Sequence, residues 1–206
     1  MYCILVTGIP AAGKSTMAEY LAEQLCLPVI SKDSIKELLY DTVGFNSREE
    51  KVRLGVASMN IMYYMAEKLM QREQAFILEN NFEHVSKEGL LAILDRYSYK
   101  AITVTLTGTY KAIYERFLER NSSPNRHRGH VVNDCYPEKK QKQNMQSKQM
   151  TQLSYEDYVG GIASRGMDSF VANGPQIIVD TTDFSKIDYD EVLRKIAEFH
   201  AEILHD

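Results

Sequence analysis

Short apolar runs alternate with longer stretches of helical periodicity along this 206-residue chain. The first run, residues 2–6, is continuously apolar and includes β-branched residues, which is typical of a strand buried on both faces of a parallel sheet. Apolar residues then recur every four positions at Met17, Leu21 and Leu25, which predicts a helix that ends before Pro28. A strand followed by a helix is the basic unit of a doubly wound α/β fold.

The same two patterns continue to the end of the chain. Further strands are expected at 28–30, 75–80, 101–108 and 175–183. Helices are expected at 33–41, 86–97 and 110–120, and after a cap formed by Asp188 and Glu191. This order predicts an α/β fold with one parallel sheet, and the length suits a single domain covering residues 1–206.

The longest helical pattern begins at a capping box formed by Ser47 and Glu50 and runs to about Gln71. Its regularly spaced apolar residues are Val52, Val56, Met59, Tyr63, Ala66 and Met70. We expect this stripe to face the core, because methionines at helical spacing are more typical of a core than of a ligand-binding surface.

The composition is that of an ordinary globular protein, with 44% hydrophobic and 25% charged residues, which argues against global disorder. The net charge of -4 argues against a general nucleic-acid binder. The three cysteines lie far apart without a metal-binding spacing, which suits a reducing compartment. Because a strand is expected from residue 2 and no apolar run approaches 18 residues, we expect no signal peptide, no membrane partner and a cytoplasmic location.

The loop between the first strand and the first helix carries the Walker A spacing G-x-x-x-x-G-K-[ST]. Its glycines would let backbone N–H groups at the helix N-terminus surround phosphate oxygens. Lys14 would reach the β- and γ-phosphates of ATP, and the Ser15 hydroxyl would bind Mg²⁺. The residues expected to contact ATP are Gly8, Ile9, Pro10, Ala11, Ala12, Gly13, Lys14, Ser15 and Thr16.

Two acidic residues follow expected strands and are therefore predicted at the carboxyl edge of the sheet, where α/β proteins bind ligands. Asp33 could accept the proton of an attacking hydroxyl, or it could be a helix N-cap. Glu79 could organise Mg²⁺ indirectly or contact a second substrate together with Asn81, although a structural role for Glu79 stays open.

A basic insertion separates the helix at 110–120 from the last strand. Between Arg120 and Lys148, seven lysines and arginines stand against two acidic residues in an otherwise acidic protein. This asymmetry fits a solvated loop or a mobile lid over phosphates, and its position favours a lid at 121–148. Arg120 and Arg126 are the leading candidates for offsetting charge on a transferring phosphoryl group, whereas Arg116 could pair with a carboxylate on its own helix.

Together these features resemble small P-loop kinases related to zeta-toxin and chloramphenicol phosphotransferase enzymes. The resemblance covers nearly the whole chain and rests on the Walker A loop and, more weakly, on SKDSIKELLYD, FILENNF, RFLERNSSPNRHRGH and IIVDTTDF. It implies a three-layer P-loop fold with strand order 2-3-1-4-5 and a lid over the nucleotide. It also implies that the loop containing Thr182 lies against adenine. Glu79 departs from the usual Asp, and Asn80 and Asn81 replace frequent glycines, which favours an indirect role for Glu79 at the metal.

The sequence therefore predicts a kinase that transfers the γ-phosphoryl group of ATP to a hydroxyl of a small molecule. Residues 35–72 are expected to bind this acceptor, with Tyr40, Phe45 and Arg48 near the pocket. One alternative is a nucleotide-dependent switch or ATPase that acts through a protein partner, and another is a toxin-like kinase of sugar nucleotides. The missing N-K-x-D sequence and the lack of a long coupling domain count against the switch. Neither the acceptor nor an oligomeric state follows from the sequence.

Overall fold

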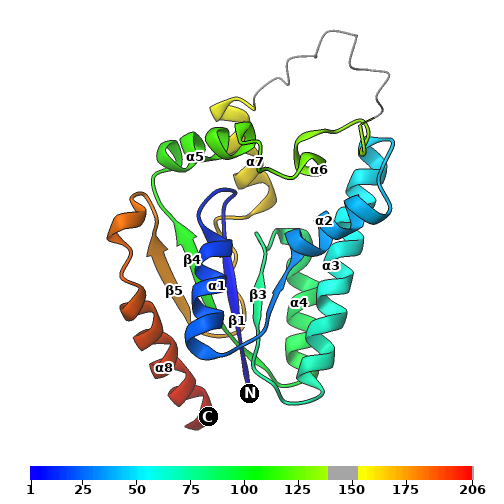
Figure 1. Ribbon diagram of the computed structural model, residues 1–206. Coiled ribbons are helices and arrows are strands. Elements are labelled where there is room, and N and C mark those ends of the chain that lie inside the picture. Colours follow the sequence, from blue (N-terminus) through cyan, green and yellow to red (C-terminus); the bar gives the residue numbers. More distant parts are fainter. Residues whose placement is uncertain (139–152, 206) are drawn as a thin grey trace.

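The computed structural model describes residues 1–138 and 153–205. Five parallel strands form one sheet in the order β2-β3-β1-β4-β5 (Figure 1). The strands are β1 (Tyr2–Gly8), β2 (Val29–Ser31), β3 (Ile77–Glu79), β4 (Lys100–Thr107) and β5 (Gln176–Asp180). Each overlaps a predicted strand, so the α/β fold class and the strand order implied by the resemblance are confirmed.

Helices connect the strands and cover the sheet (Figure 1). They are α1 (Lys14–Leu25), α2 (Lys32–Thr42), α3 (Arg48–Met70), α4 (His84–Arg96), α5 (Tyr110–Ser122), α6 (Arg128–Val131), α7 (Tyr155–Arg165) and α8 (Tyr189–His205), with a 3-10 turn η2 (Phe184–Lys186). The sequence analysis did not predict α6 and α7, which lie within the insertion. In the described part of the chain, no helix combines the length and the apolar character needed to cross a membrane.

The central strand β1 explains why the first apolar run has no polar interruption. Successive side chains of a strand point to opposite faces of the sheet. Ile4 and Val6 face a core covered by α1 and α8, whereas Cys3 and Leu5 face a core covered by α3 and α4. All four side chains are fully buried, so β1 and the loop that follows it have a fixed position at the middle of the sheet.

Helix α3 is longer than the strands it covers, since its 23 residues span roughly 34 Å. It begins at the predicted capping box, where Ser47 Oγ accepts a hydrogen bond from the Glu50 amide at 3.2 Å. Its C-terminal half packs on the sheet through Met62, Ala66 and Met70. Val52 and Val56 are 55% and 49% exposed, so the prediction that they belong to the core is wrong. Their half of the helix extends past the sheet, beside α2 (Figure 1).

Candidate active site

The Walker A loop joins β1 to α1 at the carboxyl edge of the sheet (Figure 1). Gly8 and Gly13 have φ values of 141° and 93°, which L side chains rarely adopt. A Cβ atom on Gly8 would collide with the carbonyl oxygen of Leu106, and one on Gly13 would lie 2.8 Å from Phe184 Cε1. Both motif glycines are therefore required by backbone conformation and by packing.

The N-terminus of α1 is suited to bind phosphate. Within the part of the chain that the structure describes, no side chain caps α1, and its first turn contains no acidic residue. Its first main-chain bond runs from the Met17 amide to the Gly13 carbonyl, so the preceding amides are available to an anion. The exposed hydroxyl of Ser15 lies in this first turn.

Lys14 curls back over the loop, where its Nζ donates a hydrogen bond to the Ile9 carbonyl at 3.1 Å. The side chain is only 8% exposed. Burial lowers the pKa of the Lys14 ammonium, against the opposing attraction of Glu79 and Asp33. A buried cation beside unbonded amides fits the β- and γ-phosphates of a nucleotide.

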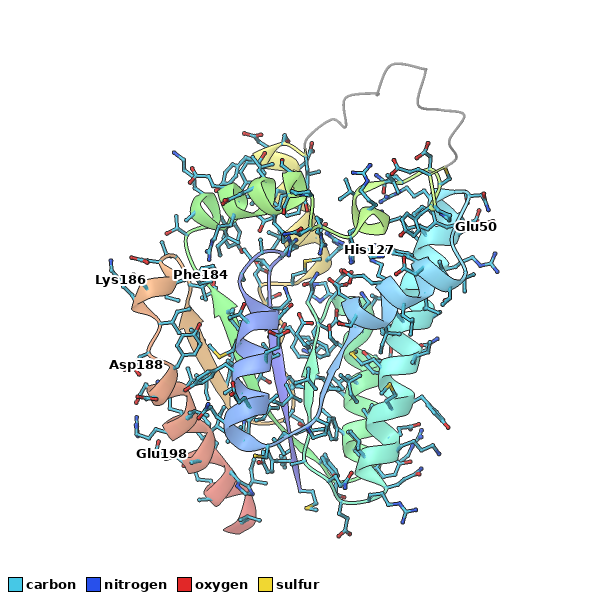
Figure 2. All side chains as sticks on the ribbon, in the orientation of Figure 1. Glu50, His127, Phe184, Lys186, Asp188 and Glu198 are labelled. Atoms are coloured by element: carbon cyan, nitrogen blue, oxygen red, sulfur yellow. The ribbon has the colours of Figure 1, made fainter. Side chains whose placement is uncertain are left out.

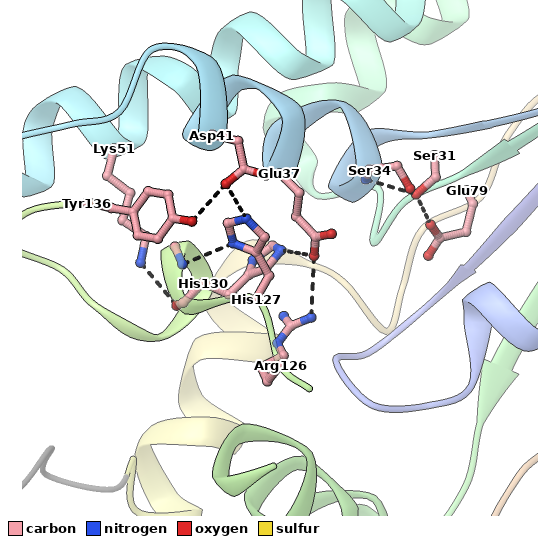
Figure 3. Close-up of polar contacts among 11 residues, drawn as sticks. Ser31, Ser34, Glu37, Asp41, Lys51, Glu79, Arg126, His127, His130 and Tyr136 are labelled. Carbon is pink, nitrogen blue, oxygen red and sulfur yellow. Dashed lines mark hydrogen bonds and ion pairs between the residues drawn. The ribbon is translucent and has the colours of Figure 1, made fainter. Parts of the chain in front are cut away.

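Glu79 is buried at the end of β3, where the sheet register pairs it with Val6 and Ser31. Ser31 Oγ donates to Glu79 Oε2 at 2.5 Å (Figure 3). Burial raises the pKa of Glu79, whereas Lys14 and the Ser31 hydrogen bond oppose this increase. One carboxylate oxygen is therefore already hydrogen-bonded, and the indirect metal role stays a prediction.

Asp33 lies in the first turn of α2, directly after β2. The alternative that it is the helix N-cap is wrong, because Ser31 occupies that position and its Oγ accepts from the amide of Ser34. Asp33 is exposed, so a substrate can reach its carboxylate. Desolvation raises its pKa, but electrostatic interactions with His130 first, and then with Lys36 and Lys14, outweigh this effect and lower the pKa overall.

The loop after β3 holds the predicted substrate residue Asn81. Its carbonyl accepts a hydrogen bond from Thr7 Oγ1 at 2.9 Å, which ties this loop to β1. Among the described residues, no hydrogen bond engages the Asn81 side-chain amide. Contact between that amide and a substrate remains a prediction.

Arg116 does not pair with a carboxylate on its own helix, so that alternative is wrong. Its Nη2 donates to the Thr181 carbonyl at 2.6 Å, and its guanidinium lies 4.0 Å from the centre of the Phe184 ring. Nη1 is buried and has no partner within the described residues. The sequence analysis missed Phe184, for which the only signal was an aromatic residue beside the predicted adenine loop.

Thr182 links the loops that follow β4 and β5. Its Oγ1 accepts a hydrogen bond from the Thr109 amide at 2.8 Å, and its own amide donates to Asp180 Oδ1 at 2.7 Å. This arrangement holds the segment that carries Phe184. Figure 2 shows Phe184 and His127 on opposite sides of the Walker A loop. The predicted contact of Thr182 with adenine is not tested by this geometry.

Arg120 and Arg126 each bury an Nε atom that lacks a partner in the described part of the chain. Burial lowers the pKa of Arg120, and nearby Arg126 lowers it further, whereas Asp33 opposes both effects. Arg126 Nη1 lies 3.9 Å from Glu37 Oε1 (Figure 3). Buried guanidinium donors without partners are suited to phosphate oxygens.

The described part of the predicted lid is attached to α2 and α3. His130 Nε2 lies 2.8 Å from Glu37 Oε1 (Figure 3). The ammonium of Lys51 donates to the carbonyls of His130 and Val132 at 3.0 and 2.5 Å. Residues 139–148 of the predicted lid lie outside the described residues, and closure of the lid stays a prediction.

A second set of contacts fixes the end of this segment. Tyr136 forms an antiparallel bridge with Phe45, and its hydroxyl donates to Asp41 Oδ1 at 2.7 Å. Tyr40 and Phe45, which were predicted near the acceptor pocket, are buried together with Val132 in a small core. Both side chains are buried, so neither presents a free surface to an acceptor.

Residues 4–150 match a family model described as an AAA domain. The chain belongs to this family. Among solved structures, it is similar to a putative kinase from Chloroflexus aurantiacus J-10-fl, with a TM-score of 0.75 and 26% sequence identity. That likeness covers 96% of this chain and 97% of the other. A comparison with curated proteins gave no match.

Two more distant structures have the same fold. A gluconokinase from Sinorhizobium meliloti 1021 has a TM-score of 0.54 at 13% identity, covering 98% of this chain and 93% of its own. A shikimate kinase from Bacteroides thetaiotaomicron has a TM-score of 0.52 at 14% identity, covering 96% of both chains. At this identity the likeness shows the P-loop fold alone.

Proposed function

We propose that this protein is an ATP-dependent kinase that phosphorylates a hydroxyl of a small molecule. The carrying observation is the exposed Asp33, which follows β2 at the same edge of the parallel sheet at which Lys14 and the phosphate-binding loop follow β1. A nucleotide switch needs the phosphate cradle, whereas a kinase also needs a base beside it. The fold shared with the putative kinase, the gluconokinase and the shikimate kinase supports the same function.

The nucleotide would bind with its phosphates on the amides of residues 8–16 and on Lys14. Arg120 supplies a further positive charge close to Lys14. Ser15 would hold Mg²⁺, which when bound neutralises part of the charge on the β- and γ-phosphates. Adenine would lie on the side of Phe184 and Thr182, away from Asp33.

In the proposed transfer, the acceptor oxygen attacks the γ-phosphorus and the bond from that phosphorus to the β–γ bridging oxygen breaks. ADP leaves, and the hydroxyl proton moves to the Asp33 carboxylate. The lowered pKa of Asp33 keeps this carboxylate ionised at neutral pH. Arg120 and Arg126 would offset charge on the moving phosphoryl group, an effect on the order of 10³ to 10⁵ in rate for such arginines.

Membership of the zeta-toxin and chloramphenicol phosphotransferase group is part of this proposal. It is supported by the four sequence segments that resemble the group. It is also supported by the basic segment 121–138, in which His130 contacts Glu37 of α2. A sugar nucleotide would be the acceptor in the toxin-like alternative.

The test is the release of ADP by the purified protein with Mg·ATP, with and without a broad panel of hydroxyl-bearing metabolites. Asp33→Asn should reduce acceptor-dependent release by roughly 10² to 10⁴ and leave ATP affinity nearly unchanged. The helix should persist because its cap is Ser31. Asp190→Asn is the matched control, because Asp190 is an exposed aspartate in the first turn of α8, away from the site. A rate of ADP release that neither rises with any acceptor nor falls in Asp33→Asn would instead indicate a switch or ATPase.

A further inference from the structure

Lys36 is a partly buried cation that the phosphate-binding loop does not use. It follows Asp33 by one helical turn on α2, and its Nζ lies 5.6 Å from the centre of the Tyr40 ring. Its Cε packs against α3, 3.7 Å from the position that a Cβ on Gly55 would occupy. Within the described ranges 1–138 and 153–205, Lys36 forms neither an ion pair nor a hydrogen bond.

Three carboxylates lie near Lys36: Asp33 is the proposed base, and the other two, Glu37 and Glu83, contact other groups. Glu37 contacts His130 at 2.8 Å and Arg126 at 3.9 Å. Glu83, which also attracts Lys36, lies 3.3 Å from Arg165. Burial lowers the pKa of Lys36, although Asp33 attracts its charge, and among the described residues no carboxylate forms an ion pair with it.

Asp33 interacts electrostatically with two lysines on different elements, Lys14 at the start of α1 and Lys36 one helical turn further along α2. Lys14, on the nucleotide side, interacts electrostatically with Glu79 and Arg120. Lys36 interacts electrostatically with Arg126 and Glu83. Both lysines lower the pKa of Asp33. A substrate whose hydroxyl meets Asp33 opposite the nucleotide would therefore extend toward Lys36.

We propose that the phosphoryl acceptor carries an anionic group, a carboxylate or a phosphate, which binds Lys36. This inference rests on the proposed kinase function. Residues three apart on a helix have Cβ atoms about 5–6 Å apart, so one small molecule can present its hydroxyl to Asp33 and its anion to Lys36. The unpartnered Nε of Arg126 adds positive charge on the same side. Lys36 thus selects the acceptor, and Asp33 activates it.

The substrate test uses matched trios within the metabolite panel. Each trio contains a neutral polyol, the related hydroxy acid and the related phosphate ester, such as glycerol, glycerate and glycerol 3-phosphate, or glucose, gluconate and glucose 6-phosphate. We expect kcat/KM for an anionic member to exceed that of its neutral partner at least about 10-fold. Comparison of the hydroxy acid with the phosphate ester identifies whether a carboxylate or a phosphate is bound. Turnover that favours neutral members would overturn this inference and leave the kinase intact, whereas no acceptor-dependent turnover would overturn both.

The variant test compares Lys36→Met with Lys68→Met. Lys68 is a matched control, because its Nζ lies 5.0 Å from the centre of the Tyr64 ring on the exposed side of α3. Lys36→Met should raise KM for the anionic acceptor roughly 10- to 100-fold and change KM for ATP much less. Lys68→Met should match the wild type.

A third variant, Lys36→Arg, retains the positive charge and should retain the preference for anionic acceptors. Thermal unfolding of each variant verifies that it is folded. An equal loss of activity toward neutral and anionic acceptors in Lys36→Met would show that Lys36 acts only on Asp33, and would overturn the inference. Retention of the anionic preference by Lys36→Met would overturn it as well.

Discussion

A tyrosine that the sequence analysis did not identify connects the insertion to the phosphate-binding loop. The hydroxyl of Tyr158 donates to the Pro10 carbonyl at 2.7 Å, and the side chain is 3% exposed. Its ring packs between Tyr114 and Phe117, at 5.3 and 5.1 Å between ring centres. Because Pro10 belongs to the loop that is proposed to hold phosphate, we predict that Tyr158 positions this loop for ATP.

Tyr158→Phe keeps the ring packing and leaves the Pro10 carbonyl without its partner. We expect KM for ATP to rise about 3- to 10-fold, with a smaller change in kcat and a loss of roughly 0.5–1.5 kcal/mol in the free energy of unfolding. Tyr155→Phe, on the same helix and 38% exposed, is the control. Steady-state kinetics and denaturant titration measure both quantities. Unchanged ATP kinetics in Tyr158→Phe would contradict the positioning role.

At the scale of elements, the projecting half of α3 holds the segment that follows α5. Lys51 lies on this half and is 9% exposed. Besides the carbonyls of His130 and Val132, its ammonium contacts Asn133 Oδ1 at 3.1 Å. One side chain therefore holds three groups, on His130 within α6 and on Val132 and Asn133 after it, and its removal should detach that segment without disturbing the sheet.

Lys51→Met leaves buried carbonyls unpaired, which costs roughly 1–3 kcal/mol per group. Hydrogen exchange should accelerate across residues 126–138 and stay unchanged in β1 and β4. Lys195→Met on α8, where the lysine side chain is 41% exposed and its Nζ lies 3.4 Å from Glu191 Oε1, is the control. Exchange in 126–138 equal to that of the wild type would show that the segment is held by other contacts.

Lys51 also predicts a pH dependence. Burial lowers its folded-state pKa to about 8, against 10.5 for the ordinary group. Between these pH values the unfolded chain binds more protons than the folded one, so stability rises with pH in this window. The wild type should gain stability relative to Lys51→Met from pH 8 to 10.5 in denaturant titrations. A constant difference would mean that Lys51 titrates normally in the folded protein.

At the scale of the whole molecule, the residues of the candidate site come from two parts of the structure. The sheet edge supplies Lys14 and Glu79, whereas α2 supplies Asp33 and Lys36, and the segment after α5 supplies Arg126. Nucleotide bound between them would contact both, so its binding energy adds to the stability of the folded chain.

A non-hydrolysable Mg·ATP analogue should slow hydrogen exchange in residues 8–16 and in the basic segment 121–138. At a concentration 100 times its Kd, it should add about 2.7 kcal/mol to the free energy of unfolding, measured as a rise in Tm. Lys14→Met should remain folded and lose this rise, because the substitution removes a desolvated charge and the phosphate contact together. A rise in Tm that persists in Lys14→Met would place the nucleotide elsewhere.

The sequence by itself determined the strands, the first helix, the capping box of α3 and the phosphate-binding loop. These features depend on periodicity and spacing over a few residues. The apolar run of β1 and the glycines at 8 and 13 are examples, because each can be recognised without knowledge of distant contacts. The exposed Val52 and Val56 mark the limit of this information, because periodicity identifies a helix face but not the length of sheet beneath it.

Only the tertiary structure decided the contacts between distant segments. It shows that Asp33 is not the cap of α2. It also shows that Arg116 donates to a carbonyl 65 residues away and that Lys51 donates to a carbonyl 81 residues away. It also placed Lys36 one helical turn from Asp33, while Glu37 and Glu83 contact other groups. Such pairings depend on how the chain folds back on itself, since a charged side chain has the same local sequence whether its partner is a carboxylate, a carbonyl or a ligand.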